Sequence, residues 1–261
     1  MLDEPENQFS FTRAALSTSG PAKTEFLSIN KAILLVGMGA LWMSLGAPLR
    51  AQTAIFDNSV YDLKNRFNPG TSQVGDEITL AGTARYLQTF TFEYWGTNTA
   101  KPDNSSFSQP ITATVMFYRN NGTPFNGYPT PANSFFTETF SVGAPTSRSV
   151  FIFTAGSDFP AGGLFIPTSD MTWSVQFSGM GPTDSVGVDL YSPPVVGGDF
   201  PDYWQNIGTV SSPNWLLLMN TVPVDFGAQM YATVPEPSTV TIWILGGLGI
   251  LTRSGGLRSK E

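Results

Sequence analysis

The chain has 261 residues, of which 41% are hydrophobic and only 13% are charged, and its formal net charge is −7. This length allows one or two domains, and the low charge content argues against a disordered polyelectrolyte and against a basic nucleic-acid-binding surface. Cysteine and histidine are both absent, which excludes thiol nucleophiles, histidine general bases and triads, Cys/His zinc sites and disulfides.

A signal peptide is predicted at the start of the chain. A polar segment over residues 1–30 is followed by a lysine and then by an uncharged, apolar stretch that ends at Leu49, just before Arg50 and Ala51. A charged flank, an apolar helix and a small residue at the boundary are typical of a secretory signal peptide. Residues 1–51 are therefore interpreted as an N-terminal extension and signal peptide that is cleaved after Ala51. The alternative is a membrane anchor that remains uncleaved.

Short strands are predicted throughout residues 52–233. Turn sequences such as NNGTP, NGYPTP and SPPVVGG separate segments in which aromatic or β-branched residues alternate with polar ones. These segments are 85–96, 111–120, 134–142, 149–155, 171–179, 185–192 and 225–232. No apolar stripe with helical spacing over three turns occurs among them. The pattern predicts one all-β domain, an antiparallel β-sandwich that is jelly-roll-like.

The alternation assigns one face of each strand to the core. The residues expected there are Phe90, Phe92, Tyr94, Ile111, Ala113, Val115, Phe117, Phe136, Phe140, Val142, Trp173, Val175 and Phe177. The opposite faces present three Thr-x-Thr pairs, Thr89/Thr91, Thr112/Thr114 and Thr137/Thr139. Ranked threonines on a flat sheet are one way to bind ice. However, threonine is favoured on any solvated strand face, and these pairs do not recur at the fixed short period of a β-solenoid.

Aromatic residues in or near predicted loops suggest a carbohydrate-binding surface, because exposed aromatic rings and amides can stack on sugar rings and bond their hydroxyls. The candidates are Trp95, Tyr128, Tyr203, Trp204 and Trp215. Since 13% of all residues are aromatic, packing in the core or at its rim remains the competing interpretation for each of them.

Acidic residues form four pairs that are close in sequence: Asp57/Asp62, Asp76/Glu77, Asp184/Asp189 and Asp199/Asp202. They offer the oxygen ligands that Ca²⁺ takes, but none has the spacing of a known calcium loop, so solvated turns are the favoured interpretation and calcium is the alternative. No other metal or cofactor is expected. Residues 52–233 hold 14 acidic and 6 basic side chains, which argues against binding a polyanion such as nucleic acid.

One acidic residue falls on a predicted core face. Glu138 shares its strand parity with Phe136 and Phe140, and a buried carboxylate must be paired or neutralised unless it lies at a strand end. Arg119 is the expected partner. A glycosidase would need a second carboxylate across a cleft, and Glu93 with Glu138 does not match the motifs of sandwich-fold glycosidases. We therefore expect a protein that is not an enzyme and has no catalytic residues.

The end of the chain predicts a short membrane helix. Pro235 and Pro237 stop the preceding strand and fix where a helix can begin. From Ser238 to Thr252 there is no charge, and a helix of about 15 residues spans roughly 23 Å, less than the roughly 30 Å hydrocarbon core. Three basic residues then follow, Arg253, Arg258 and Lys260, which is the side expected to remain cytoplasmic. The alternative is a buried C-terminal helix of the soluble domain.

This order of elements resembles the PEP-CTERM sorting signal of exported bacterial proteins, which is also known as the ice-binding protein C-terminal motif. The residues that carry the resemblance are Val234, Pro235, Glu236, Pro237 and Ser238, then the apolar run with its Gly247-Leu248 pair, then the basic tail. The resemblance implies a Gram-negative, often exopolysaccharide-producing bacterium. It also implies an exosortase-type membrane transpeptidase that recognises the Pro-Glu-Pro and removes the tail, so residues 234–261 are interpreted as a sorting and anchor segment.

Together these features predict a protein that signal peptidase and exosortase process at the inner membrane and that ends at the cell surface or in the extracellular matrix. The expected role is structural or adhesive, as a component of the cell envelope or exopolysaccharide matrix. The alternative is a carbohydrate-binding module for that polysaccharide, and a glycoside hydrolase or an ice-binding protein is a more distant one.

Overall fold

The computed structural model describes residues 51–101 and 103–234, and this part of the chain consists of strands and loops. The fourteen strands are β1 (Thr53–Asn58), β2 (Asp62–Phe67), β3 (Gln73–Thr79), β4 (Tyr86–Asn98), β5 (Ile111–Asn120), β6 (Pro131–Val142), β7 (Thr146–Thr154), β8 (Leu164–Phe165), β9 (Asp170–Ser178), β10 (Asp184–Tyr191), β11 (Gly198–Asp199), β12 (Asp202–Asn206), β13 (Trp215–Met219) and β14 (Ala228–Thr233). Each of the seven segments predicted from alternation contains a strand, although β14 begins only at Ala228 of the segment 225–232.

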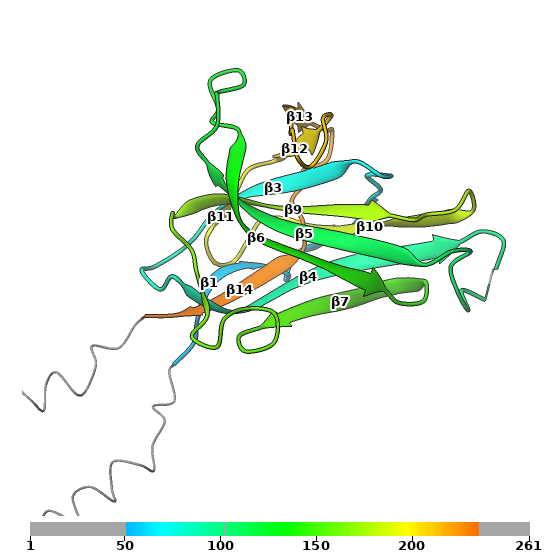
Figure 1. Ribbon diagram of the computed structural model, residues 1–261, viewed down its shortest axis with the longest axis horizontal. Helices are drawn as coiled ribbons and strands as arrows, with labels where there is room; N and C mark the ends of the chain where they lie inside the picture. Colours follow the sequence, from blue (N-terminus) through cyan, green and yellow to red (C-terminus); the bar gives the residue numbers. More distant parts are fainter. Residues whose placement is uncertain (1–50, 102, 235–261) are drawn as a thin grey trace, which may run out of the picture. The chain divides into compact units, whose positions relative to one another are not determined.

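The strands form two antiparallel sheets (Figure 1). One sheet has the order β1-β14-β4-β10-β2, with β7 and β8 paired to the other edge of β4. The second has the order β13-β12-β3-β9-β5-β6, with β11 paired to β3. β6 and β7 follow one another in sequence but belong to different sheets, so the chain crosses between the sheets at this edge.

The inner faces of the two sheets enclose one aromatic-rich core, as the alternation predicted. Phe90 on β4 meets Phe117 on β5 and Trp173 on β9, with ring centroids 5.0 and 5.3 Å apart. These three side chains are fully buried. The other predicted core positions on β4, β5 and β9 are buried as well, whereas Phe136 and Phe140 on the edge strand β6 are only half-buried against the core. The prediction of an all-β domain with two antiparallel sheets is confirmed.

A second, smaller core lies on the outer face of the β5-containing sheet. Met116 and Tyr118 on β5 pack there with Trp204 of β12 and Trp215 of β13, and Tyr118 meets Trp215 edge-on with ring centroids 5.5 Å apart. β12 and β13 therefore cover part of a face that alternation alone marks as solvated. In Figure 1 they lie at the top of the molecule, next to the loop that joins β5 and β6.

The predicted pair between Glu138 and Arg119 is not formed. Arg119 is exposed at the end of β5 opposite Ala132, while Glu138 lies opposite Val115, four residues earlier on β5. Four residues of strand amount to about 13 Å, too far for an ion pair. The ion pairs found in the described part of the chain involve other residues. Glu138 is half-buried on an edge strand, where its carboxylate can reach water.

The first and last described strands are neighbours. β1 pairs with β14 in antiparallel register, with Thr53 opposite Ala232. Ala51, the predicted cleavage site, and Val234, the first residue of the predicted sorting motif, are both exposed just beyond these strands. The predicted signal helix and C-terminal helix, with Pro235–Ser238, Arg253, Arg258 and Lys260, lie outside the described residues.

Candidate functional site

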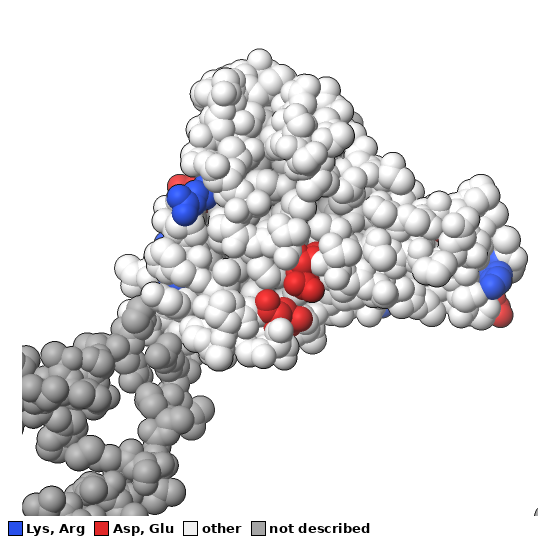
Figure 2. Space-filling view, viewed as in Figure 1, with Lys and Arg blue, Asp and Glu red and all other residues white. Residues whose placement is uncertain are grey.

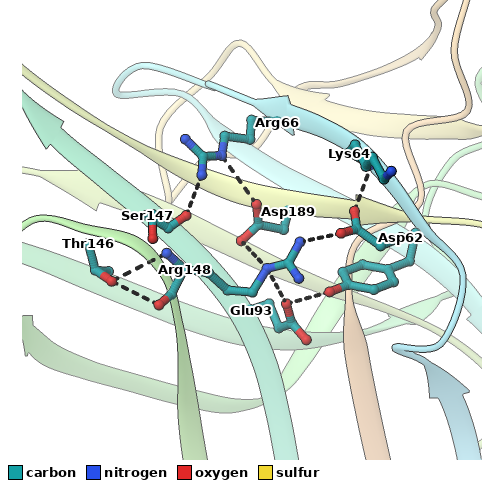
Figure 3. Close-up of polar contacts among 9 residues, drawn as sticks. Asp62, Lys64, Arg66, Glu93, Thr146, Ser147, Arg148 and Asp189 are labelled. Carbon is teal, nitrogen blue, oxygen red and sulfur yellow. Dashed lines mark hydrogen bonds and ion pairs between the residues drawn. The ribbon is translucent and has the colours of Figure 1, made fainter.

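Three places on the domain bring polar or aromatic side chains together, and the first is a charged network on the β4-containing sheet (Figure 3). We define the charged network as Asp62 and Arg66 of β2, Glu93 of β4, Arg148 of β7, and Asp189 and Tyr191 of β10. These strands are distant in sequence but adjacent in the sheet, because β4 pairs with both β7 and β10 and β10 pairs with β2.

Arg148 is the centre of the charged network. Its Nη2 lies 2.6 Å from Asp62 Oδ2, and its Nε lies 3.2 Å from Glu93 Oε2 and 3.8 Å from Asp189 Oδ2. Arg66 approaches Asp189 from the other side at 3.6 Å. The hydroxyl of Tyr191 donates to Glu93 Oε2 at 2.6 Å. Each of the three carboxylates is therefore held by at least one guanidinium group.

The pKa values of this network follow from burial and from these partners. The hydrogen bond from Arg148 lowers the pKa of Asp62. Asp189 is only 2% exposed, and burial raises its pKa to about 6 even though Arg148 and Arg66 oppose the rise. Burial, followed by the bond to Glu93, raises the pKa of Tyr191. The carboxylates are paired with guanidinium groups, and these ion pairs connect side chains from four neighbouring strands.

The second place is a buried carboxyl cluster between the sheets, which we define as Asn58, Asp76, Asp199 and Asp225. Asn58 ends β1, Asp76 points inward from β3, Asp199 lies on β11 and Asp225 precedes β14. Asn58 Nδ2 donates to the carbonyl oxygens of Tyr191 and Phe226 at 3.0 and 3.4 Å and to Asp199 Oδ2 at 3.3 Å. The cluster therefore takes one member from each of four chain segments.

The pKa values of all three carboxyl groups in this cluster are raised. Asp76 Oδ2 accepts a hydrogen bond from the Phe226 amide at 2.7 Å, yet burial, followed by the adjacent Asp199, raises the pKa of Asp76 well above its usual value. Burial and the charge of Asp225 likewise raise the pKa of Asp199. Burial raises the pKa of Asp225 to about 6. Unlike the charged network, these groups form none of the ion pairs found in the described residues.

The third place is a groove between the β5–β6 loop and the β12–β13 hairpin, which we call the uncharged groove. It consists of two hollows of about 490 and 300 Å³ that share Ala132 and Pro213. The lining residues are Met116, Tyr118, Gly122, Thr123, Pro124, Phe125, Thr130, Pro131, Ala132, Asn133, Ser134, Val210, Pro213, Asn214 and Trp215. These volumes are in the range of small-molecule sites, roughly 300 to 1,000 Å³.

None of the residues that line this groove is charged, and all of them except Met116 and Tyr118 come from two uncharged segments. The sequence is free of Lys, Arg, Asp and Glu from 120 to 137 and again from 203 to 224. Figure 2 shows the same end of the molecule, above β3 in the view of Figure 1, without charged atoms. The groove offers aromatic and proline surfaces together with the side-chain amides of Asn133 and Asn214, which are exposed.

The five aromatic candidates from the sequence have different fates. Trp95, Trp204 and Trp215 are buried, and Tyr203 is half-buried against the main core. Trp95 packs under Arg66, whose guanidinium carbon lies 5.5 Å from the ring centroid. Trp204 donates its indole N–H to Glu77 at 3.1 Å. Only Tyr128 is an exposed ring, 55% accessible, and Trp215 contributes to the groove from beneath.

The threonine pairs do not share one surface. Thr112 and Thr114 lie on β5 beside Thr137 and Thr139 on β6, and the hydroxyls of Thr114 and Thr139 are 2.9 Å apart. Thr89/Thr91 belong to β4 in the other sheet. A single flat array of all three pairs, as an ice-binding face would require, is therefore not formed.

The acidic pairs chosen by sequence proximity separate in the same way. Asp57 accepts hydrogen bonds from Ser59 and Gln229, and Asp184 accepts from Ser108 and Gly181. Asp62 and Asp189 instead meet through Arg148. Asp76 and Asp199 were each named as candidates in separate acidic pairs. That they lie near Asn58 and Asp225 depends on long-range strand pairing, which the sequence does not show.

Comparisons with family models, with curated proteins and with solved structures found no match to this chain. The likeness of residues 234–261 to a sorting signal therefore stays a prediction. In the described part of the chain, no helix has the length and apolar character needed to cross a membrane.

Proposed function

We propose that this protein is an exported structural or adhesive component of the bacterial surface or exopolysaccharide matrix, and that it holds neutral polysaccharide in the uncharged groove. Signal peptidase would cleave after Ala51, and an exosortase-type transpeptidase would act at Val234–Ser238. The sandwich is assigned to the jelly-roll-like class. A signal helix and a C-terminal helix are part of the proposal, and both fall on residues outside the described ranges.

The uncharged groove carries this proposal. A polysaccharide presents hydroxyl groups and flat apolar ring faces, and both match a surface of aromatic, proline and amide groups. Phe125 is half-buried on one wall, and Asn214 is exposed on the other. Because the lining carries no charge, the groove offers no cation to an acidic polymer, whose charged groups would have to lose their hydration there.

The position of the chain ends supports a role at a surface. Since β1 and β14 are paired, both predicted processing sites leave the domain next to one another. Figure 1 shows these strands in the lower part of the molecule and the β12–β13 hairpin at its top. A tail held at the membrane would therefore leave the groove accessible.

A non-enzymatic role is proposed because the carboxylates nearest to a catalytic pairing are already engaged. Glu93 is bound by Arg148 and by the Tyr191 hydroxyl, and Asp189 lies between Arg66 and Arg148. A glycosidase needs one carboxyl group that is free to protonate a leaving group and a second that acts as nucleophile or base. The charged network does not offer such a pair.

Affinity electrophoresis in gels that contain a neutral or an acidic polysaccharide tests the groove. We expect retardation by a neutral glucan, and a reduction of the affinity by about five- to tenfold in Phe125→Ala and Asn214→Ala. Tyr61→Ala is the matched control, because Tyr61 is an exposed aromatic residue away from the groove. Equal retardation of all variants, or no retardation in any neutral polymer, would contradict the assignment.

The sorting half of the proposal is tested by mass spectrometry of the native protein from envelope and medium fractions. The expected mature chain begins at Gln52 and ends near Pro235–Pro237. A chain that keeps its C-terminus would refute processing by a transpeptidase and leave the groove assignment intact.

A further inference from the structure

Buried oxygen atoms without a hydrogen-bond partner are concentrated in the buried carboxyl cluster. In the described residues four side-chain oxygens are buried and unpartnered, namely Asn58 Oδ1, Asp76 Oδ1, Asp225 Oδ1 and Asp189 Oδ2. Asp189 Oδ2 belongs to the charged network and faces Arg148 at 3.8 Å. The other three belong to the cluster, where no such cation is near.

Such oxygens are costly unless something compensates them. A buried acceptor without a partner costs about 1–3 kcal/mol, and more when it is charged, so unpartnered buried groups in native proteins commonly mark an ion or water site. Asn58 is itself fully buried, and its amide is turned toward the carboxyls, with Nδ2 3.3 Å from Asp199 Oδ2. Its Oδ1 is buried without a hydrogen-bond partner, so this oxygen is available as a neutral ligand atom.

We propose that the buried carboxyl cluster binds one calcium ion, with ligand atoms from Asn58, Asp76, Asp199 and Asp225. This goes beyond the proposed role of the groove and does not depend on it. The ion would link β1 and the segment before β14 in one sheet to β3 and β11 in the other. Calcium would thereby act as a crosslink between the two sheets.

The donor set favours calcium over other metals. All four candidate ligands are oxygen donors, and the chain has no His or Cys to hold zinc or copper. Calcium accepts carboxylate, amide and water oxygens in irregular arrangements, whereas magnesium demands a near-ideal octahedron. In the described ranges, no group of three or more His, Cys, Asp or Glu side chains is placed so that these side chains alone could hold a metal ion. The Asn58 amide and water would therefore complete the shell, after a small movement of the carboxylates.

Calorimetry and thermal unfolding of the full-length protein test the site with CaCl₂ as the probe and MgCl₂ for comparison. At about pH 7.5 we expect saturable heat of calcium binding, and a rise of about 5 °C in Tm between EDTA and excess calcium. Asp199→Asn and Asp225→Asn should abolish both signals. Asp103→Asn is the matched control, because Asp103 is exposed in the loop after β4, and it should respond like the wild type.

Acidification distinguishes a calcium site from a proton-sharing cluster. Calcium must compete with protons for the carboxylates, so its affinity should fall at least about tenfold between roughly pH 7.5 and pH 5. The proposal is overturned if calcium produces neither heat nor a Tm shift at either pH. It is also overturned if Asp199→Asn and Asp225→Asn, folded as judged by circular dichroism, keep the wild-type calcium response.

Discussion

The charged network and the buried carboxyl cluster hold the same number of carboxyl groups in very different surroundings. In the network, Asp62, Glu93 and Asp189 surround Arg148, whose side chain is 44% exposed. In the cluster, Asp76 and Asp225 are buried and Asp199 is half-buried, and burial together with neighbouring carboxyl groups raises the pKa values of Asp76 and Asp199. The same domain therefore surrounds one acidic group with two guanidinium groups and leaves the other without an ion-pair partner among the described residues.

The number of carboxyl groups in a domain therefore does not indicate which of them have cationic partners. In this domain the partners are found at the sheet surface and not in the interior. Arginine can serve the network because Arg66 and Arg148 lie exposed at the sheet surface and their guanidinium groups still reach the carboxylates. Burying a guanidinium group in the interior would carry a large desolvation cost. A small divalent ion or a shared proton can occupy the space that a guanidinium cannot.

The largest expected effect comes from removing the cation of the network. Arg148→Ala leaves Asp189 nearly buried with Arg66 as its remaining partner, and it also frees Asp62 and Glu93. We expect a loss of about 2–3 kcal/mol in the free energy of unfolding, below the roughly 3–5 kcal/mol of a fully buried pair because Arg148 is partly exposed. Urea unfolding at neutral pH measures it.

Arg119→Ala is the control for this variant, because Arg119 is exposed and outside the network. It should change the free energy of unfolding by less than about 0.5 kcal/mol. Equal stabilities of the two variants would mean that the ion pairs around Arg148 contribute nothing beyond a solvated surface charge.

Some strands were predictable from the sequence and others were not. β4, β5 and β9 were predicted with their faces, because alternating aromatic and polar residues specify which side is buried. β2 and β3 were missed, since DLKNRF and QVGDEIT contain charged residues and glycine that are uncommon in strands. Asp76 shares its face of β3 with the buried Val74 and Ile78, but an aspartate at a core position weakens the alternating pattern that would identify the strand.

The candidate sites were less predictable than the strands, for a related reason. Alternation says which residues share a face but not which strands become neighbours. The uncharged groove joins residues 122–134 to residues 210–215, and the carboxyl cluster joins positions 58, 76, 199 and 225. Trp204 and Trp215 were predicted to lie in or near loops. They lie instead on β12 and β13, where they pack against Met116 and Tyr118.

A smaller effect, which sharpens the comparison, is the pH dependence of stability in EDTA. Asp189 and Asp225 each have a folded-state pKa of about 6, above the usual 3.8. Between these values the folded state binds more protons than the unfolded state, so the free energy of unfolding falls as pH rises from about 4 to about 7. Asp62, whose pKa is lowered, acts oppositely and loses its contribution as pH falls below about 4.

Two variants separate the contributions of the two groups to this slope, as measured by urea unfolding in EDTA across the pH range. Asp225→Asn should flatten the fall between about pH 4 and pH 7, because an amide does not titrate. Arg148→Ala should extend the fall to higher pH, because Asp189 then loses a cation that opposes the effect of burial on its pKa. If Asp225→Asn kept the full slope, Asp225 would not be a source of the pH dependence, and the raised pKa values of Asp76 and Asp199 would be its origin within the cluster. If Arg148→Ala left the slope unchanged, the guanidinium group would not control the titration of Asp189.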